Sequence, residues 1–112
     1  MLERTTFTLD VGRLLFDFDP DSGSIFDFLR GQGVDLNLAR HTIDACAAGD
    51  TDAELLGCPV ASPLLRERRV TSSSAGTPFE YSDDRYLPGV TNFTIENTAE
   101  RRAALVRVVS SA

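Results

Sequence analysis

The amino-acid sequence predicts an α+β domain, with a mainly antiparallel β-sheet and helices packed on it. The strongest observation is in residues 63–95, where two runs of period-two alternation flank a turn that contains Gly76. Such alternation is typical of strands with one buried face, and glycine adopts a positive φ at low cost. Short helical patterns between further alternating runs favour helices on one side of an antiparallel sheet. The 112 residues are enough for one domain.

The first half of the chain is predicted to pass from sheet to helix and back to sheet. Residues 2–9 alternate and are rich in threonine, which favours a strand. Residues 11–21 lack a regular period and are expected to form a loop or a short irregular segment that ends at Pro20. A helix is predicted over residues 25–30, because Ile25, Phe28 and Leu29 recur at helical spacing, and Gly31 and Gly33 end it. Residues 34–48 alternate again and predict a long, alanine-rich strand.

The second half is predicted to be mainly sheet. Thr51 and Glu54 form a capping-box pattern, which indicates a short helix over residues 52–56. The central hairpin follows, with strands at residues 63–71 and 79–87, and then a short strand that ends at Ile95. Residues 99–109 are compatible with a terminal helix, although Val108 and Val109 also suit a strand.

Composition excludes several classes of function. The net charge of −6 argues against direct nucleic-acid binding, which needs basic side chains to neutralise phosphates. Neither a signal peptide nor an apolar run long enough to span a membrane is visible, so we expect a cytoplasmic protein with no membrane contact. Cys46 and Cys58 do not form a metal-binding pair and are expected to be reduced thiols.

Several short motifs, in order, carry a family resemblance. Residues 23–29 (GSIFDFL) are similar to a serine-capped S-L-Y-x-x-L helix, and residues 76–82 (GTPFEYS) to G-x-P-x-E-Y-S in a hairpin. Between them lie a strand, a short helix and a P-L-L-R strand, at residues 39–45, 53–57 and 62–66. Over residues 22–96 the chain resembles the UTRA domain, the effector-binding and dimerising module of GntR-type transcription regulators of the HutC subfamily. The resemblance implies a chorismate lyase-like fold.

The resemblance also implies a domain organisation. Residues 1–98 correspond to a partial UTRA domain, and residues 99–112 to a C-terminal helix or frayed tail. The winged helix and the first UTRA hairpin have no counterpart, since Glu3-Arg-Thr matches a strand midway through the domain. In the closing motif, residues 86–93, the family's charged pair and second tyrosine are replaced by Gly89, Val90 and Thr91. That replacement predicts a less charged effector or the loss of family-type binding.

Four residues are ligand-binding candidates through the resemblance: Ser24, Glu80, Glu3 and Tyr86. Ser24 matches the serine that helps bind the anionic part of the effector, and the positive end of a helix dipole suits that role. It is equally compatible with a plain N-cap. Glu80 matches a ligand-facing glutamate that accepts from a hydroxyl or amine. Its alternative is a solvated strand face opposite Arg66 or Arg68.

No catalytic residue, metal site or cofactor is predicted. Residues 17–21 (DFDPD) open like a calcium loop, but Gly23 is one place late and Phe28 stands where the loop needs glutamate. His41 has no readable nucleophile partner and is expected to be structural.

The predicted function is therefore that of a non-enzymatic regulatory module. It would bind a small metabolite, form a homodimer and modulate DNA binding by a winged helix. Two alternatives remain open at this point. One is a ligand-free oligomerisation or partner-binding module, because a missing hairpin leaves an unpaired sheet edge. The other is a chorismate lyase-like enzyme, for which no general acid–base pair is visible.

Overall fold

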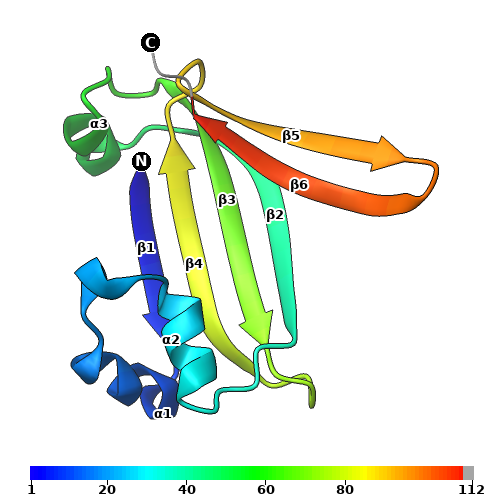
Figure 1. Ribbon diagram of the computed structural model, residues 1–112. Helices are drawn as coiled ribbons and strands as arrows, with labels where there is room; N and C mark the ends of the chain where they lie inside the picture. The colour runs from blue at the N-terminus through cyan, green and yellow to red at the C-terminus, as the bar shows by residue number, and fades with distance from the viewer. Residues whose placement is uncertain (110–112) are drawn as a thin grey trace. The chain divides into compact units, whose positions relative to one another are not determined.

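The computed structural model describes residues 1–109 and confirms the α+β, mainly antiparallel fold. Four strands form one sheet in the order β1-β4-β3-β2, with neighbouring strands running in opposite directions, and β5 and β6 form a separate two-stranded sheet (Figure 1). The strands are β1 (Leu2–Phe7), β2 (Leu38–Ala47), β3 (Pro63–Ser72), β4 (Pro78–Tyr86), β5 (Thr91–Thr98) and β6 (Arg101–Val109). The helices are α1 (Leu9–Gly12), α2 (Ile25–Gly31) and α3 (Asp50–Leu56).

The chain divides into two compact units, each with its own apolar core. The first, here called the α2 unit, comprises Glu3–Ile43 and Glu67–Asp84. The second, the α3 unit, comprises Met1–Leu2, Asp44–Arg66 and the described residues from Arg85 onward.

The core of the α2 unit forms where α1 and α2 pack their apolar faces on β1 and β4. Leu29 is fully buried together with Val11 and Phe79, and Ile25 and Phe28 pack against them. These α2 residues are the ones whose helical spacing predicted the helix. Their burial fixes α2 on the sheet and so defines the space beside it.

The core of the α3 unit is smaller and contains both cysteines. It is built on the buried residues Ala48, Ala53 and Leu64, against which Cys46 and Cys58 pack as free, partly buried thiols. The helix α3 begins at Asp50 behind Gly49, which offers no side-chain cap, so the capping box predicted from the sequence is wrong. Gly57 ends the helix in the left-handed conformation, at φ 69°, which glycine adopts without strain.

Two other regions differ from the sequence prediction. Residues 11–21, predicted as a loop or short irregular segment, contain the end of α1 and two short 3₁₀ turns, Arg13–Asp17 and Pro20–Ser22. The terminal helix is wrong, because Arg101–Val109 form β6 and pair antiparallel with β5, from Thr91 opposite Val109 to Thr98 opposite Arg101. A helix of this length is marginal without a packing partner, whereas hairpin pairing satisfies the same backbone groups. Residues 110–112 of that prediction lie outside the described part of the chain.

Within residues 1–109, every helix is too short or too polar to cross a membrane.

Candidate functional site

A cleft in the α2 unit lies between α2 and the strands β2 and β3. Its volume is about 370 Å³. Its walls combine polar and apolar side chains, which suits a small polar molecule with some apolar surface. The lining residues come from the start of α2, from the segment that leads into β2, and from β2 and β3: Ser24, Phe26, Asp27, Arg30, Leu36, Asn37, Leu38, Ala39, His41, Arg69 and Thr71.

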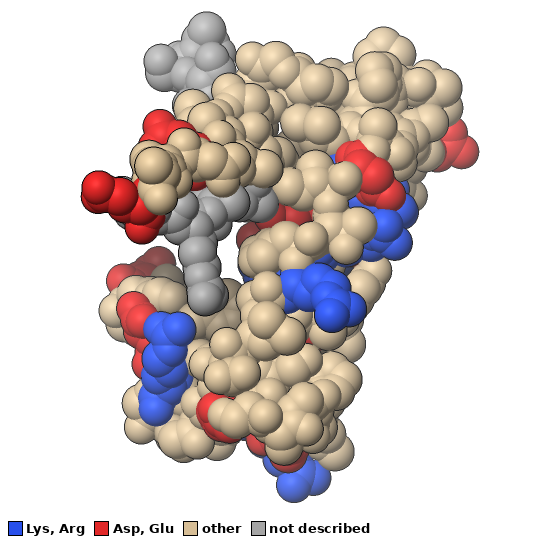
Figure 2. All heavy atoms as spheres, turned by 90° about the vertical axis from the view of Figure 1, so that its right-hand side faces the viewer, with Lys and Arg blue, Asp and Glu red and all other residues tan. Residues whose placement is uncertain are grey.

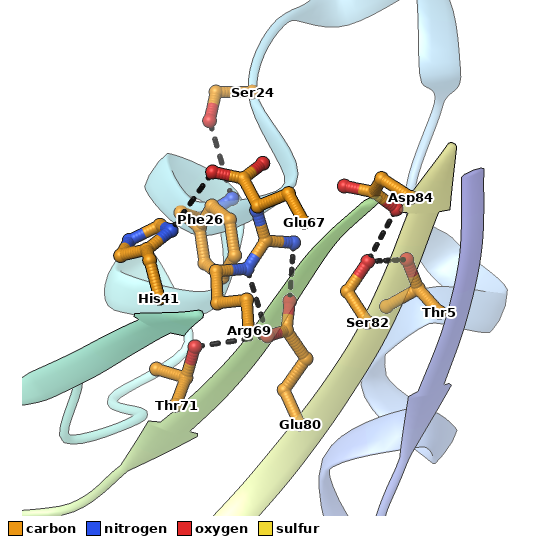
Figure 3. Close-up of polar contacts among 10 residues, drawn as sticks. All are labelled: Thr5, Ser24, Phe26, His41, Glu67, Arg69, Thr71, Glu80, Ser82 and Asp84. Carbon is orange, nitrogen blue, oxygen red and sulfur yellow. Dashed lines mark hydrogen bonds and ion pairs between the residues drawn. The ribbon is translucent and has the colours of Figure 1, made fainter. Parts of the chain in front are cut away.

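Arg69 is the most firmly held of these lining residues (Figure 3). Its Nε and Nη2 donate to the two carboxylate oxygens of Glu80, at 3.0 and 2.8 Å. The ring of Phe26 lies 5.1 Å from the guanidinium carbon, a cation–π distance. Burial tends to lower the pKa of Arg69, but the hydrogen bonds to Glu80 and its negative charge outweigh that effect and raise it. The guanidinium is therefore charged and fixed in orientation.

Glu80 lies behind Arg69 and is not on a solvated face. Its side chain has no exposed surface, and Thr71 Oγ1 donates to its Oε1 at 2.9 Å. The predicted alternative, in which Glu80 faces solvent opposite Arg66 or Arg68, is wrong, since its partner is Arg69. Its carboxylate already accepts from Arg69 and Thr71, so it orients a cleft residue.

A second polar pair borders the cleft. His41 Nδ1 lies 3.2 Å from Glu67 Oε2, and His41 is 37% exposed while Glu67 is 9% exposed. The sequence predicted a structural role for His41, which stays a prediction, and the structure places His41 among the residues that line the cleft. The missed signal is the alternation in β3, which places Glu67, Arg69 and Thr71 on one face.

A third set of polar side chains, beside the face of β3 that carries Glu67 and Arg69, links β1 and β4. Ser82 Oγ donates to Asp84 Oδ1 at 2.7 Å and lies 3.2 Å from Thr5 Oγ1. Burial raises the pKa of the Asp84 carboxyl above its ordinary value of 3.8. The hydrogen bond from Ser82 and the charge of Arg69 oppose that rise, and nearby Glu3 and Glu67 add to it.

The raised pKa of Asp84 predicts a pH dependence of stability. Between pH 3.8 and the raised value, the folded state binds more protons than the unfolded state, so the free energy of unfolding falls as pH rises. Asp84→Asn removes this titration and can still accept from Ser82. We expect urea denaturation from about pH 4 to about pH 7 to show the variant gaining stability relative to the wild type. A constant difference across this range would contradict the prediction.

Ser24 reaches the cleft from the start of α2. Its Oγ accepts from the backbone N–H of Phe26 at 3.2 Å and from that of Asp27 at 3.5 Å. Ser24 is thus the N-cap of α2, and its hydroxyl can still donate one hydrogen bond.

Replacing Ser24 tests the capping role. Ser24→Ala is expected to lower the free energy of unfolding by about 1 kcal/mol, because two N–H groups of α2 lose their acceptor. Ser22→Ala, just outside α2, is the comparison: it removes an exposed hydrogen bond from Ser22 Oγ to the Asp19 carbonyl at 2.7 Å and should cost less stability than Ser24→Ala. Urea denaturation measures both. An unchanged midpoint for Ser24→Ala would show that the cap contributes nothing.

The other two predicted site residues do not line the cleft. Glu3 is exposed on β1 and acts on Arg69 only through its charge. Tyr86 belongs to the α3 unit, where it is 1% exposed and packs edge-on against Phe93 with ring centroids 5.4 Å apart.

The acidic residues ahead of α2 make local contacts. Asp19 caps the 3₁₀ turn Pro20–Ser22 by accepting from the N–H of Asp21 at 3.0 Å. Within residues 1–109, no three metal-ligating side chains gather in a possible metal site.

Comparisons with known proteins identify the family of the chain. The family model of the UTRA domain matches residues 1–89. A GntR-family transcriptional regulator from Enterococcus faecalis V583 has a similar structure, with a TM-score of 0.66 and 25% identity over 85% of this chain and 78% of that one. A putative transcriptional regulator from Streptomyces coelicolor has a TM-score of 0.57 and 26% identity, over 92% of this chain and 58% of that one.

A third solved structure shares the fold. The possible transcriptional regulator YydK from Bacillus subtilis has a TM-score of 0.60 and 24% identity, over 76% of this chain. The chain spans only 38% of the length of YydK. No curated protein matches the sequence. Because the family match takes in most of its residues, the chain belongs to the UTRA domain family.

Proposed function

We propose that the chain is the effector-binding domain of a GntR-type transcription regulator of the HutC subfamily. A small metabolite binds in the cleft between α2 and the strands β2 and β3. Binding modulates DNA contact by a winged helix, and the domain acts as a cytoplasmic homodimer without catalytic activity. The fold neighbours named as transcriptional regulators support the regulatory role.

The observation that carries the proposal is the fixed position of Arg69 at the cleft wall. Glu80 and Phe26 hold its guanidinium before any ligand arrives, and Thr71 in turn donates to Glu80. A side chain that is already ordered loses little conformational entropy on binding, which favours affinity. Ser24 offers a hydroxyl from the opposite wall, so a ligand in the cleft would contact both α2 and the sheet.

Such a ligand would couple two elements of the domain. It would bridge α2 and β3. If the distance between α2 and β3 differed between two states of the domain, the affinity for the ligand would differ between those states. That coupling is the means by which occupancy of the cleft would be transmitted to a second site.

The test is a thermal-shift screen against metabolite classes, followed by calorimetry on every hit. Ala39 is exposed and lines the cleft, so Ala39→Trp should fill it and abolish binding. Ala75→Trp makes the same change at an exposed turn in the same unit and should bind like the wild type. If no class of metabolite stabilises the folded wild type, or if Ala39→Trp binds as tightly, the proposal is wrong.

A further inference from the structure

The cationic side chains that line the cleft each contact a carboxylate. Arg69 is held by both oxygens of Glu80. The two other pairs are Arg30 with Asp27, at 3.4 Å, and His41 with Glu67, at 3.2 Å. On the side of the molecule drawn in Figure 2, several arginine side chains lie directly beside acidic ones.

Carboxylates also outnumber the arginines around the cleft. Asp84 and Glu3 act on Arg69 through their charges, in addition to Glu80. Glu80 and Asp84 are almost fully buried, at 3% exposed each, so water screens their charges poorly. The potential in the cleft is therefore neutral to negative, despite the arginines on its walls.

We propose that this cleft takes an effector without negative charge, held through hydroxyl, amide or amine groups, and that it disfavours phosphate esters and dicarboxylates. The inference rests on the proposed function, whose binding site it describes.

The geometry gives the reason for this selectivity. An anion placed against Arg69 would approach the buried carboxylate of Glu80, which already occupies two of the guanidinium's donors. Repulsion between like charges would offset the attraction to Arg69. A neutral hydroxyl or amide can accept from the outer N–H groups of Arg69 without that cost.

The walls supply partners for such groups. Asn37 offers a donor and an acceptor, Ser24 a hydroxyl, and Asp27 an exposed carboxylate that can accept from an amine. Leu36 and Leu38 provide apolar surface for the remainder of the molecule.

Three nitroxide probes of one ring size test the charge of the cleft without an identified effector: aminomethyl-, carbamoyl- and carboxy-PROXYL. Each enhances the relaxation of amide protons near which it accumulates. At low salt, we expect the cationic probe to relax the amide protons of residues 37–41 as strongly as the anionic probe or more strongly, because a neutral to negative potential does not concentrate an anion. Stronger relaxation by the anionic probe in the wild type would overturn the proposal.

Two variants distinguish the effect of a charge beside the cleft from the effect of the net charge of the protein. Glu80→Gln exposes the charge of Arg69 and should lower the cationic-to-anionic ratio in the cleft. Glu54→Gln removes the same charge from an exposed position on α3 and should leave the ratio in the cleft nearly unchanged. Equal effects of the two variants would contradict the proposal, and the wild-type measurement decides it if Glu80→Gln does not fold.

The metabolite screen distinguishes this inference from the proposed function. A phosphate ester that binds the wild type and not Ala39→Trp would overturn the charge selectivity and leave effector binding intact. Binding of glucose or glucosamine in preference to glucose 6-phosphate would support the selectivity. If nothing binds, the proposed function fails, whereas the nitroxide ratio still reports the potential.

Discussion

Glu80→Ala is expected to lower the free energy of unfolding by about 3 kcal/mol, measured by urea denaturation at neutral pH. The substitution leaves the guanidinium of Arg69, only 17% exposed, without its buried counter-ion. Removing one partner of a buried ion pair costs about 3–5 kcal/mol, and the residual exposure of Arg69 favours the lower end of that range. Thr71 Oγ1 also loses its acceptor.

The double variant Arg69→Met/Glu80→Leu provides the decisive comparison. Replacing both members of a buried pair with apolar residues is often nearly neutral, so this variant should be more stable than Glu80→Ala. Both should lose effector binding, because Arg69 is either displaced or absent. Glu54→Ala, at an exposed position on α3, should change stability by less than about 0.5 kcal/mol. If Glu80→Ala matched this control, the buried pair would not stabilise the domain.

The strands could be predicted from the sequence, but the buried face of β4 could not. The alternation of Glu80, Ser82 and Asp84 with Phe79 and Tyr81 predicted a strand correctly. A hydropathy argument places the first three residues in solvent, yet all three are buried while Tyr81 is 45% exposed.

The physical reason is that their partners come from distant parts of the chain. Glu80 is buried because Arg69 and Thr71 on β3 satisfy it, and Ser82 lies beside Thr5 on β1. A buried polar group is tolerated only when hydrogen-bonded, and strand order decides which partners are available. The order β1-β4-β3-β2 follows from packing that local patterns do not encode.

The candidate site could be predicted only in part, because some of its contacts are local in the sequence and others cross the sheet. Ser24 could be assigned from local chemistry, since an N-cap depends on the residues that follow it. Glu80 was identified through its motif, but its role as the residue that orients Arg69 depends on contacts across the sheet. Arg69 itself was missed, because three arginines in a row of four residues give no indication of which one points at the cleft.

The C-terminal segment shows a different limit of prediction from the sequence. The sequence of residues 99–109 is compatible with helix and strand, and only the presence of β5 as a pairing partner selects the strand. When local preference is balanced, a tertiary contact determines the secondary structure.

Tyr86→Ala is expected to lower the free energy of unfolding by about 3–5 kcal/mol, because truncation of a buried aromatic side chain leaves a cavity. Tyr86 is 1% exposed and packs against Phe93 in the α3 unit. The family motif suggested a ligand contact, whereas this burial favours a structural role. Phe16→Ala makes a comparable truncation at a side chain that is 88% exposed, and should change stability by less than about 0.5 kcal/mol.

Effector binding separates the two roles of Tyr86. If Tyr86 is structural, Tyr86→Leu, which retains much of the apolar volume, should bind a screened metabolite as tightly as the wild type once the folded fraction is taken into account. If Tyr86 contacts the ligand, the folded variant itself should bind more weakly. Calorimetry at a temperature well below the midpoint of thermal unfolding measures that difference. Loss of affinity in a fully folded Tyr86→Leu sample would show that Tyr86 contacts the ligand.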